Sequence, residues 1–390
     1  MLQRKIKKIF LKSVAAFPVV ILTGARQTGK STLCKELLKK THEYVSLEDP
    51  DIRKRALEDP RTFLQTHKAP LILDEIQYAP ELVSYIQTIV DQKRDKAGQY
   101  ILTGSQNFLL MQQVSQSLAG RAALLSLYPC SVEEVDGVGK VRSSPEEVAD
   151  WILSGGYPEL RTRPEVDRNT WCASYIRLYL ERDVRQVIQV GDLDIFEKFL
   201  SLVAARTGQI LNMSNLSRDA GVSVPTITRW LSVLRASYQV YFLEPFHANI
   251  SKRLIKAPKI YFGDTALASF LMGIHDKRLL HSSPFIGPLF ETACFLEHIK
   301  AASFRTDLSR FSYFRTKEGL EIDLMIESGT KLHAREIKSS RTITSQLAKN
   351  LLEAEKLLER GFNKKILAPV ERKIVLAHKV EVLPWHQIEW

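Results

Sequence analysis

The feature that most constrains this chain is the stretch from Val19 to Leu33, which reads VVILTGARQTGKSTL. An apolar run is followed by two glycines in a GxxxxGKS pattern and then by residues that favour a helix. A loop of this kind presents backbone N–H groups to a phosphate, and the N-terminus of the following helix adds its positive dipole end. The stretch therefore predicts a buried strand, a phosphate-binding loop and a helix in succession.

The predicted loop supplies both a cation and a metal ligand. Lys30 can reach the β- and γ-phosphates of a nucleoside triphosphate, and Ser31 can ligate Mg²⁺. We therefore expect ATP and Mg²⁺ as the ligands of this segment. The residues expected to contact the nucleotide are Gly24, Ala25, Arg26, Gln27, Thr28, Gly29, Lys30, Ser31, Thr32 and, from a later segment, Ser105.

Short apolar segments follow at residues 44–47, 70–73, 99–103 and 123–127, and helical stretches separate most of them. This order predicts a parallel sheet covered by helices. The segment at 70–73 belongs to PLILDEIQ and delivers Asp74 and Glu75 at its C-terminal end. We expect Asp74 to hold Mg²⁺ through water, and Glu75 to orient and deprotonate the attacking water.

Two further segments offer polar groups to the same site. Ser105, Gln106 and Asn107 follow the strand in ILTGSQN, where they form either a sensor of the γ-phosphate or a polar turn. Arg121 precedes the last strand and could act as an arginine finger, in its own or a neighbouring subunit, or pair with a surface carboxylate. Arg26, inside the loop, is the second candidate for a finger.

With these motifs the chain resembles the prokaryotic AAA-type ATPases that join this nucleotide site to a C-terminal domain of unknown function related to the PD-(D/E)xK nucleases. The resemblance rests on the order and spacing of GARQTGKST, LILDEIQ, ILTGSQNFLL, SLAGR, GGYPEL and YLERD. We expect an α/β chain with a P-loop parallel-sheet ATPase domain at 1–140, a helical linker and winged-helix domain at 145–275, and a restriction-endonuclease-like α/β domain at 283–390.

The middle of the chain has the layout of a helix-turn-helix. Residues 213–220 form the first predicted helix and 224–235 the second, with Gly221 at the turn. Pro225 suits the first turn of the second helix, because proline there gives up no needed N–H. The module predicts either DNA contact or, alternatively, a dimerisation or lid element.

Strands predicted at 238–245 and 259–262 would form the wing of this module. The side chains expected to reach a groove of DNA are Thr226, Thr228 and Arg229. The side chains expected to add phosphate contacts are Lys252, Arg253, Lys256 and Lys259.

The C-terminal part has a pattern of helices and strands that suits a nuclease-like sheet. Asp323 lies in an alternating strand, and Glu336 and Lys338 on the next strand point to the same face because they are two residues apart. The two carboxylates could bind Mg²⁺ while Lys338 supports a hydroxide nucleophile. Glu291 and Gln346 on flanking helices complete the resemblance. The pattern leaves open whether this domain cleaves DNA or only binds it.

Charge and composition narrow the partners. The net charge of +11 favours an anionic partner, and we expect nucleic acid. No window approaches 18 uninterrupted apolar residues, and the opening MLQRKIKKIFLKS lacks the long apolar core of a secretory signal. Four scattered cysteines match neither a disulfide frame nor a metal motif. We expect a cytoplasmic protein with free thiols and no membrane partner.

These observations lead to one hypothesis and two alternatives. The leading hypothesis is a Mg²⁺-dependent, homo-oligomeric ATPase that remodels or translocates DNA through its winged-helix and nuclease-like domains. The first alternative is a switch whose ATP state governs assembly with a protein partner. The second is an ATP-gated DNA nuclease.

Overall fold

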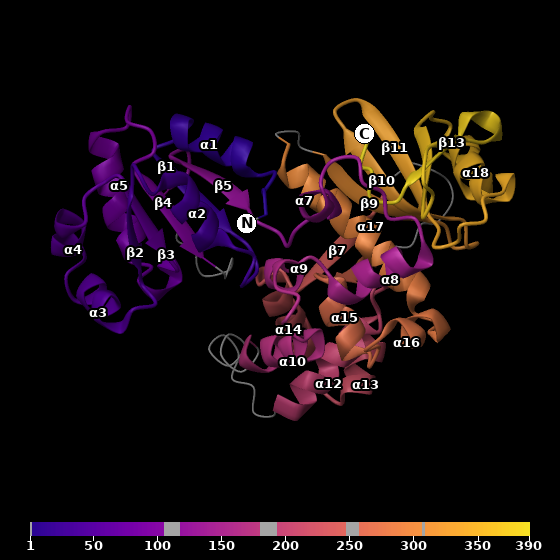
Figure 1. Cartoon of the computed structure of the whole chain (residues 1–390), viewed down its shortest axis with the longest axis horizontal. Helices are drawn as coiled ribbons and strands as arrows, with labels where there is room; N and C mark the ends of the chain where they lie inside the picture. The colour runs from indigo at the N-terminus through magenta and orange to yellow at the C-terminus, as the bar shows by residue number, and fades with distance from the viewer. Residues whose placement is uncertain (1, 105–117, 180–192, 247–256, 306–308) are drawn as a thin grey trace. The chain divides into compact units, whose positions relative to one another are not determined.

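The computed structural model describes residues 2–104, 118–179, 193–246, 257–305 and 309–390. The chain divides into two compact units, of which unit 1 comprises Met1–Cys130 and Ala236–Tyr238, and unit 2 comprises Ser131–Arg235 and Gln239–Trp390. Figure 1 draws most of unit 1 in indigo to violet and unit 2 in magenta to yellow.

Unit 1 contains a five-stranded parallel sheet in the order β2-β3-β4-β1-β5. The strands are β1 (Val19–Thr23), β2 (Glu43–Ser46), β3 (Leu71–Asp74), β4 (Tyr100–Gly104) and β5 (Ala122–Ser126). The described helices are α1 (Lys7–Ala16), α2 (Lys30–Leu38), α3 (Pro50–Glu58), α4 (Pro60–Thr66), the short η1 (Ile76–Tyr78) and α5 (Leu82–Gln92). The predicted parallel sheet is confirmed, and β4 lies between β1 and β3.

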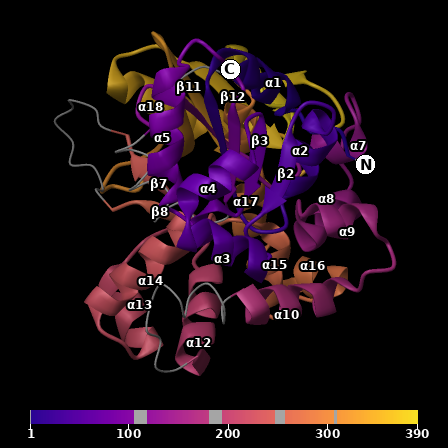
Figure 2. The same cartoon turned by 90° about the vertical axis from the view of Figure 1, so that its left-hand side faces the viewer.

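The core of unit 1 follows from the apolar composition of its strands. Every residue of β1 is buried, and Val19 and Ile21 alternate with Val20 and Leu22 across the two faces of the sheet. Val19 and Ile21 share one buried cluster with Phe63 of α4 and with side chains of α5. These helices lie on the viewer's side of the sheet in Figure 2. A strand buried on both faces is typical of parallel sheets covered by helices.

Unit 2 contains a nine-stranded mixed sheet in the order β13-β14-β12-β11-β10-β9-β7-β8-β6. The strands are β6 (Gln209–Ile210), β7 (Val240–Pro245), β8 (Lys259–Phe262), β9 (Arg310–Arg315), β10 (Glu321–Ser328), β11 (Lys331–Ile337), β12 (Asn363–Ala368), β13 (Ile374–Val375) and β14 (Glu381–Pro384). The described α-helices are α7 (Val132–Asp136), α8 (Pro145–Ser154), α9 (Pro158–Thr162), α10 (Arg168–Tyr179), α12 (Leu193–Ala204), α13 (Met213–Ala220), α14 (Val224–Ala236), α15 (Thr265–Leu271), α16 (Lys277–Ser282), α17 (Ile286–Ser303) and α18 (Lys349–Leu358). Two 3₁₀ helices, η3 (Ser345–Ala348) and η4 (Ala377–Lys379), also lie among the described residues of this unit.

The two helices of the predicted helix-turn-helix form as α13 and α14. Asn212 caps α13 by accepting from the N–H of Asn215, and Gly221 ends this helix at a φ of +77°. The left-handed conformation at Gly221 explains why glycine marks the turn. In Figures 1 and 2, α12, α13 and α14 lie together within unit 2.

The strands that sequence reasoning assigned to a separate wing continue instead into the C-terminal sheet. β7 pairs antiparallel with β8 and parallel with β9, with Glu244 opposite Ser312. One buried cluster also joins Trp151, Trp230 and Trp385 from distant parts of the chain. The residues expected at 145–275 and 283–390 therefore share one sheet and one core. Among the described helices, none has the length and apolarity to cross a bilayer.

Candidate functional site

The phosphate-binding loop joins β1 to α2 through two glycines in unusual conformations. Gly24 has a φ of +144°, and a Cβ atom there would lie 2.1 Å from the carbonyl oxygen of Leu127. Gly29 precedes α2 at a φ of +92°. Both positions need a residue without a side chain, because the first lacks space and both have left-handed φ angles. Among the other predicted contact residues, Ala25 and Thr28 are buried, Arg26 is half-buried, and Gln27 and Thr32 are exposed.

The Lys30 side chain folds back into the loop. Its Nζ donates to the carbonyl oxygens of Gly24 at 3.0 Å and Ala25 at 2.9 Å. Burial lowers the pKa of Lys30, and the carboxylates of Glu75 and Asp74 act in the opposite direction. The ammonium group therefore lies inside the loop that binds phosphate in this motif, where an anionic ligand would replace the carbonyl contacts.

Asp74, at the end of β3, accepts hydrogen bonds from three hydroxyl groups. Ser31 Oγ donates to Oδ1 at 2.9 Å and to Oδ2 at 2.8 Å. Tyr44 donates to Oδ2 at 2.5 Å, and the Thr103 hydroxyl donates to Oδ1. The Ser31 hydroxyl and the Asp74 carboxylate thus lie side by side as hard oxygen donors, which Mg²⁺ prefers. The residues present fit a Mg²⁺ ion beside a bound nucleotide.

Glu75 follows in a conformation that non-glycine residues adopt rarely. Its φ is +57° and its ψ is +52°, and its N–H donates to Thr103 Oγ1 at 3.3 Å. Gln77 Nε2 donates to Glu75 Oε2. Left-handed backbone at a non-glycine residue clusters at functional sites, where the surrounding structure holds it. The adjoining strands and Gln77 therefore fix this carboxylate one residue beyond Asp74.

Arg4 supports the loop from the N-terminal segment, and no local pattern in the sequence marks it. Its Nη1 donates to the carbonyl of Thr28 at 2.7 Å, and its Nη2 donates to the carbonyl of Tyr128 at 2.5 Å. The Thr28 hydroxyl in turn donates to the carbonyl of Ala25 at 2.9 Å. Arg4 therefore links the loop to the segment after β5.

Arg121 lies at the N-terminal ends of the parallel strands, whereas the loop lies at their C-terminal ends. It precedes β5, which is parallel to β1, whereas Gly24 follows β1. A five-residue strand separates its two ends by about 17 Å. Arg121 instead forms a double ion pair with Asp91, with Nε at 2.6 Å and Nη2 at 2.9 Å from its carboxylate oxygens. The surface ion pair is therefore observed, and a finger role for Arg121 stays a prediction.

Two other predictions about this site concern Arg26 as a finger and residues 105–107 as a sensor, and both stay predictions. Arg26 lies in the loop, where its charge contributes to lowering the pKa of Lys30. Ser105, Gln106 and Asn107 lie outside the described residues.

The acidic residues predicted in the C-terminal part do gather within unit 2. Asp323 Oδ2 accepts from the N–H of Ile337 at 2.7 Å, and Glu336 Oε1 accepts from Lys338 Nζ at 2.6 Å. Burial and Asp323 raise the pKa of Glu336, although Lys338 opposes this shift. Glu336 Oε2 is buried without a hydrogen-bond partner. Burial and the charge of Asp323 raise the pKa of Glu291, on α17, to about 7.

Lys259 places its ammonium group among these carboxylates. Its Nζ lies 2.6 Å from Glu321, 3.0 Å from Glu291 and 3.8 Å from Asp323. Burial lowers the pKa of Lys259, but the three carboxylates outweigh burial and raise it above its ordinary value. Its side chain is only 3% exposed, so the prediction that Lys259 contacts DNA phosphate is wrong. Lys252, Arg253 and Lys256 lie outside the described residues.

Sequence reasoning missed several members of this centre, because they come from elements far apart in the chain. Tyr261 donates to Glu291 at 2.6 Å, and Asn350 donates to Glu336 at 3.4 Å. Gln346 is exposed on η3, so Asn350 rather than Gln346 is the amide that reaches Glu336. Within the described ranges, no group of three or more His, Cys, Asp or Glu side chains is arranged to hold a metal ion.

The predicted DNA-contacting side chains lie on α14. Thr228 and Arg229 are exposed and Thr226 is half-buried. Thr228 Oγ1 donates to the carbonyl of Val224 at 2.9 Å, and the hydroxyls of Thr226 and Ser223 lie 2.8 Å apart. The two threonine hydroxyls are therefore engaged within the start of the helix.

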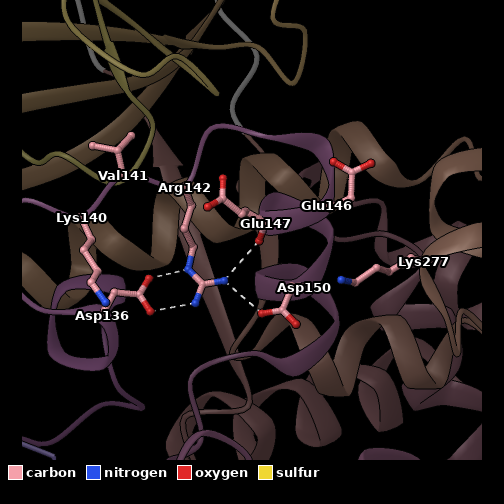
Figure 3. Close-up of a pocket in the computed structure, with 8 residues that line it drawn as sticks. All are labelled: Asp136, Lys140, Val141, Arg142, Glu146, Glu147, Asp150 and Lys277. Atoms are coloured by element: carbon pink, nitrogen blue, oxygen red, sulfur yellow. Dashed lines mark hydrogen bonds and ion pairs between the residues drawn. The ribbon is translucent and has the colours of Figure 1, made fainter.

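A polar pocket of about 480 Å³ lies elsewhere in unit 2 (Figure 3). Arg142 crosses it and pairs with Asp136 at 2.5 Å and with Asp150 at 3.0 Å. The pocket is lined by Asp136, Lys140, Val141, Arg142, Glu146, Glu147, Asp150 and Lys277. Its lining thus combines four carboxylates with three cationic side chains, those of Lys140, Arg142 and Lys277.

The sheet order and the arrangement of the loop, Lys30, Ser31 and Asp74 define a fold of the P-loop ATPase type in unit 1. The model of the family described as "AAA domain" matches residues 16–136. Two domains of unknown function also match, DUF8612 at residues 145–278 and DUF4143 at residues 286–388.

The chain belongs to the family of the uncharacterized protein Rv2008c of Mycobacterium tuberculosis. The two are 30% identical over 371 residues, which cover 95% of this chain and 81% of the relative. The uncharacterized protein Mb2031c of Mycobacterium bovis matches to the same extent. Among solved structures, the chain is similar to the Walker-type ATPase PABY2304 of Pyrococcus abyssi, with 15% identity, a TM-score of 0.47, and coverage of 70% of this chain and 96% of that one.

Proposed function

We propose that this P-loop ATPase hydrolyses ATP with the help of Mg²⁺. The observation that carries the proposal is the contact of Ser31 with both oxygens of Asp74, beside the buried ammonium of Lys30. The loop N–H groups and Lys30 bind the phosphates, and Ser31 and Asp74 hold the metal. When bound, Mg²⁺ supplies positive charge that offsets the charge on the phosphate oxygens.

Glu75 supplies the base in this proposal. Its carboxylate follows Asp74 directly, and Gln77 and Thr103 fix its side chain and backbone. A carboxylate at this position orients a water molecule and accepts its proton as the water attacks phosphorus. A second chain would have to provide any arginine finger from Arg121, so we propose that the chain works as a homo-oligomer.

We further propose that hydrolysis remodels or translocates DNA bound to unit 2. The support is the α13–Gly221–α14 arrangement, the exposed Arg229 on α14, and the net charge of +11. A second helix of this kind presents its N-terminal residues to the major groove, and a basic surface adds sequence-independent attraction.

DNA binding is tested by fluorescence anisotropy with a labelled duplex at about 50 and 200 mM salt. We expect binding to weaken steeply with salt, and Arg229→Ala to weaken it about tenfold at the lower salt, since a good base contact contributes about 1–3 kcal/mol. Arg360→Ala, which removes an exposed arginine outside α13 and α14, is the matched control. Equal DNA binding by Arg229→Ala and wild type would show that Arg229 on α14 does not contact the DNA.

A switch that assembles with a protein partner is the second candidate. Val138 is 87% exposed and Leu178 is 67% exposed, and exposed apolar side chains favour protein contacts. If duplex DNA neither binds nor stimulates hydrolysis at low salt, the DNA proposal fails. The switch proposal then predicts nucleotide-dependent capture of a partner that resists high salt.

A further inference from the structure

We propose that Lys259 is the resident cation of the acidic centre in unit 2, in the place that the nuclease resemblance assigns to a divalent metal. The centre consists of Glu291, Glu321, Asp323 and Glu336 with Lys259 and Tyr261. The inference goes beyond ATP hydrolysis and is independent of it, because every residue of the centre belongs to unit 2.

The first step is the position of the ammonium group. Lys259 Nζ lies 2.6 Å from Glu321 Oε1 and 3.0 Å from Glu291 Oε1, and Asp323 Oδ1 is 3.8 Å away. Three carboxylates from α17 and β10 therefore surround one cation that β8 supplies. A divalent ion placed among the same oxygens would meet the ammonium charge at a few ångströms, where like charges repel strongly.

The second step is that this lysine has no solvated alternative. All four residues of β8 are buried, and Lys259 is paired in the sheet with Leu243 of β7 and Ile210 of β6. Its side chain, 3% exposed, lies within the protein along its whole length. A metal ion could enter only if the ammonium group moved away from its carboxylates. No water would then solvate the displaced charge, because the side chain is buried.

The third step is that further donors of the chain already engage several of the carboxylate oxygens. Tyr261 donates to Glu291 Oε1 at 2.6 Å, and the N–H of Ile337 donates to Asp323 Oδ2 at 2.7 Å. Arg315 Nη1 lies 2.9 Å from Glu321 Oε2. Glu336 Oε2 is buried without a hydrogen-bond partner. These residues do not fit a Mg²⁺ ion, which requires near-octahedral oxygen ligands.

The centre therefore acts as a neutralised junction between β8, α17 and β10, and it is not a cleavage site. Lys259 determines this outcome: without its ammonium group, three neighbouring carboxylates and the open oxygen of Glu336 would form a cation site.

The test measures thermal unfolding of unit 2 with Mn²⁺ as the probe and no nucleotide. All five tryptophans lie in unit 2, so intrinsic tryptophan fluorescence reports on this unit alone. A ligand that binds only the folded state raises Tm. We expect Mn²⁺ to leave the Tm of wild type unchanged and to raise that of Lys259→Met by about 5 °C at roughly 100 Kd.

Two further variants complete the experiment. Lys365→Met removes another buried lysine, which pairs with Glu389 at 2.6 Å and Glu381 at 3.5 Å, and we expect no Mn²⁺ response from it. Adding Asp323→Asn to Lys259→Met should abolish the gained shift. The proposal is overturned if wild type itself shows a Mn²⁺ shift that Asp323→Asn removes, or if folded Lys259→Met shows none. The wild-type measurement keeps the test decisive if Lys259→Met fails to fold.

Discussion

The Ser31 hydroxyl donates to both carboxylate oxygens of Asp74, at 2.9 and 2.8 Å, and so connects the start of α2 with the end of β3. The same carboxylate accepts a third contact, at 2.5 Å, from Tyr44 on β2. Burial and the Asp74 carboxylate raise the pKa of Tyr44, so its hydroxyl stays protonated as a donor. Ser31 at the start of α2 and Tyr44 on β2 therefore orient the carboxylate that we assign to Mg²⁺.

Removing the Tyr44 hydroxyl should impair hydrolysis without unfolding unit 1. A hydrogen bond to a charged group contributes about 1.5–3 kcal/mol, so Tyr44→Phe should lower ATP turnover about tenfold or more. Tyr85→Phe removes the hydroxyl of a tyrosine that is 37% exposed on α5 and should leave turnover unchanged. Equal turnover in the two variants would show that Tyr44 does not orient Asp74 during catalysis.

The position of Arg121 predicts a dependence on protein concentration. Because Arg121 lies at the strand ends away from the phosphate-binding loop, Arg121→Ala should keep wild-type turnover in dilute, monomeric protein. A loss that emerges only when chains associate would assign Arg121 to the neighbouring subunit. Asp91→Ala breaks the same ion pair and is the matched control for lost stability. A large loss at every concentration in Arg121→Ala alone would contradict the assignment.

Unit 2 should lose stability as the pH falls below about 6.5, partly through His386. The N–H of Arg142 donates to His386 Nε2 at 3.1 Å, and burial is the main cause that lowers the pKa of His386 to about 4. The ordinary pKa of histidine, about 6.5, applies to the unfolded chain. Between these values the unfolded state binds more protons, so stability is full above pH 6.5 and decreases toward pH 4.

The measurement is urea unfolding followed by tryptophan fluorescence at pH 7.5 and 5.0. His386→Gln keeps an acceptor for Arg142 but cannot titrate, so wild type should lose about 2 kcal/mol more than this variant between the two pH values. The exposed His281 on α16 provides the control His281→Gln, which should behave as wild type. Identical pH dependence in all three proteins would exclude His386 as a source.

Local sequence patterns predicted the strand, loop and helix of the candidate nucleotide site, because these residues follow one another closely along the chain. Gly24 to Ser31 form one loop, and Asp74 and Glu75 end one apolar strand, so spacing and residue type define the chemistry. Tyr44 was missed because its contact with Asp74 depends on the order of the strands in the sheet. Arg4 was missed because it binds a backbone carbonyl of a segment distant in the sequence. Neither feature has a local signature.

The C-terminal centre shows where sequence reasoning fails. Lys259 and Asp323 are 64 positions apart in the sequence, and the successive pairing of β8 with β7, β7 with β9 and β9 with β10 brings their strands into one sheet. The basic residues around Lys259 suggested a DNA-contacting surface. Burial of β8 reverses that interpretation, because a buried ammonium needs carboxylate partners.

The central claim is that Glu75 acts as the base in ATP hydrolysis at the Lys30, Ser31 and Asp74 site. The most direct test compares steady-state ATP turnover and ATP binding in wild type and Glu75→Gln, with Lys30→Ala as the variant that removes a phosphate contact. We predict that Glu75→Gln binds ATP as wild type does but loses about 100-fold or more in turnover, and that Lys30→Ala turns over no ATP. Wild-type turnover in Glu75→Gln would contradict the account.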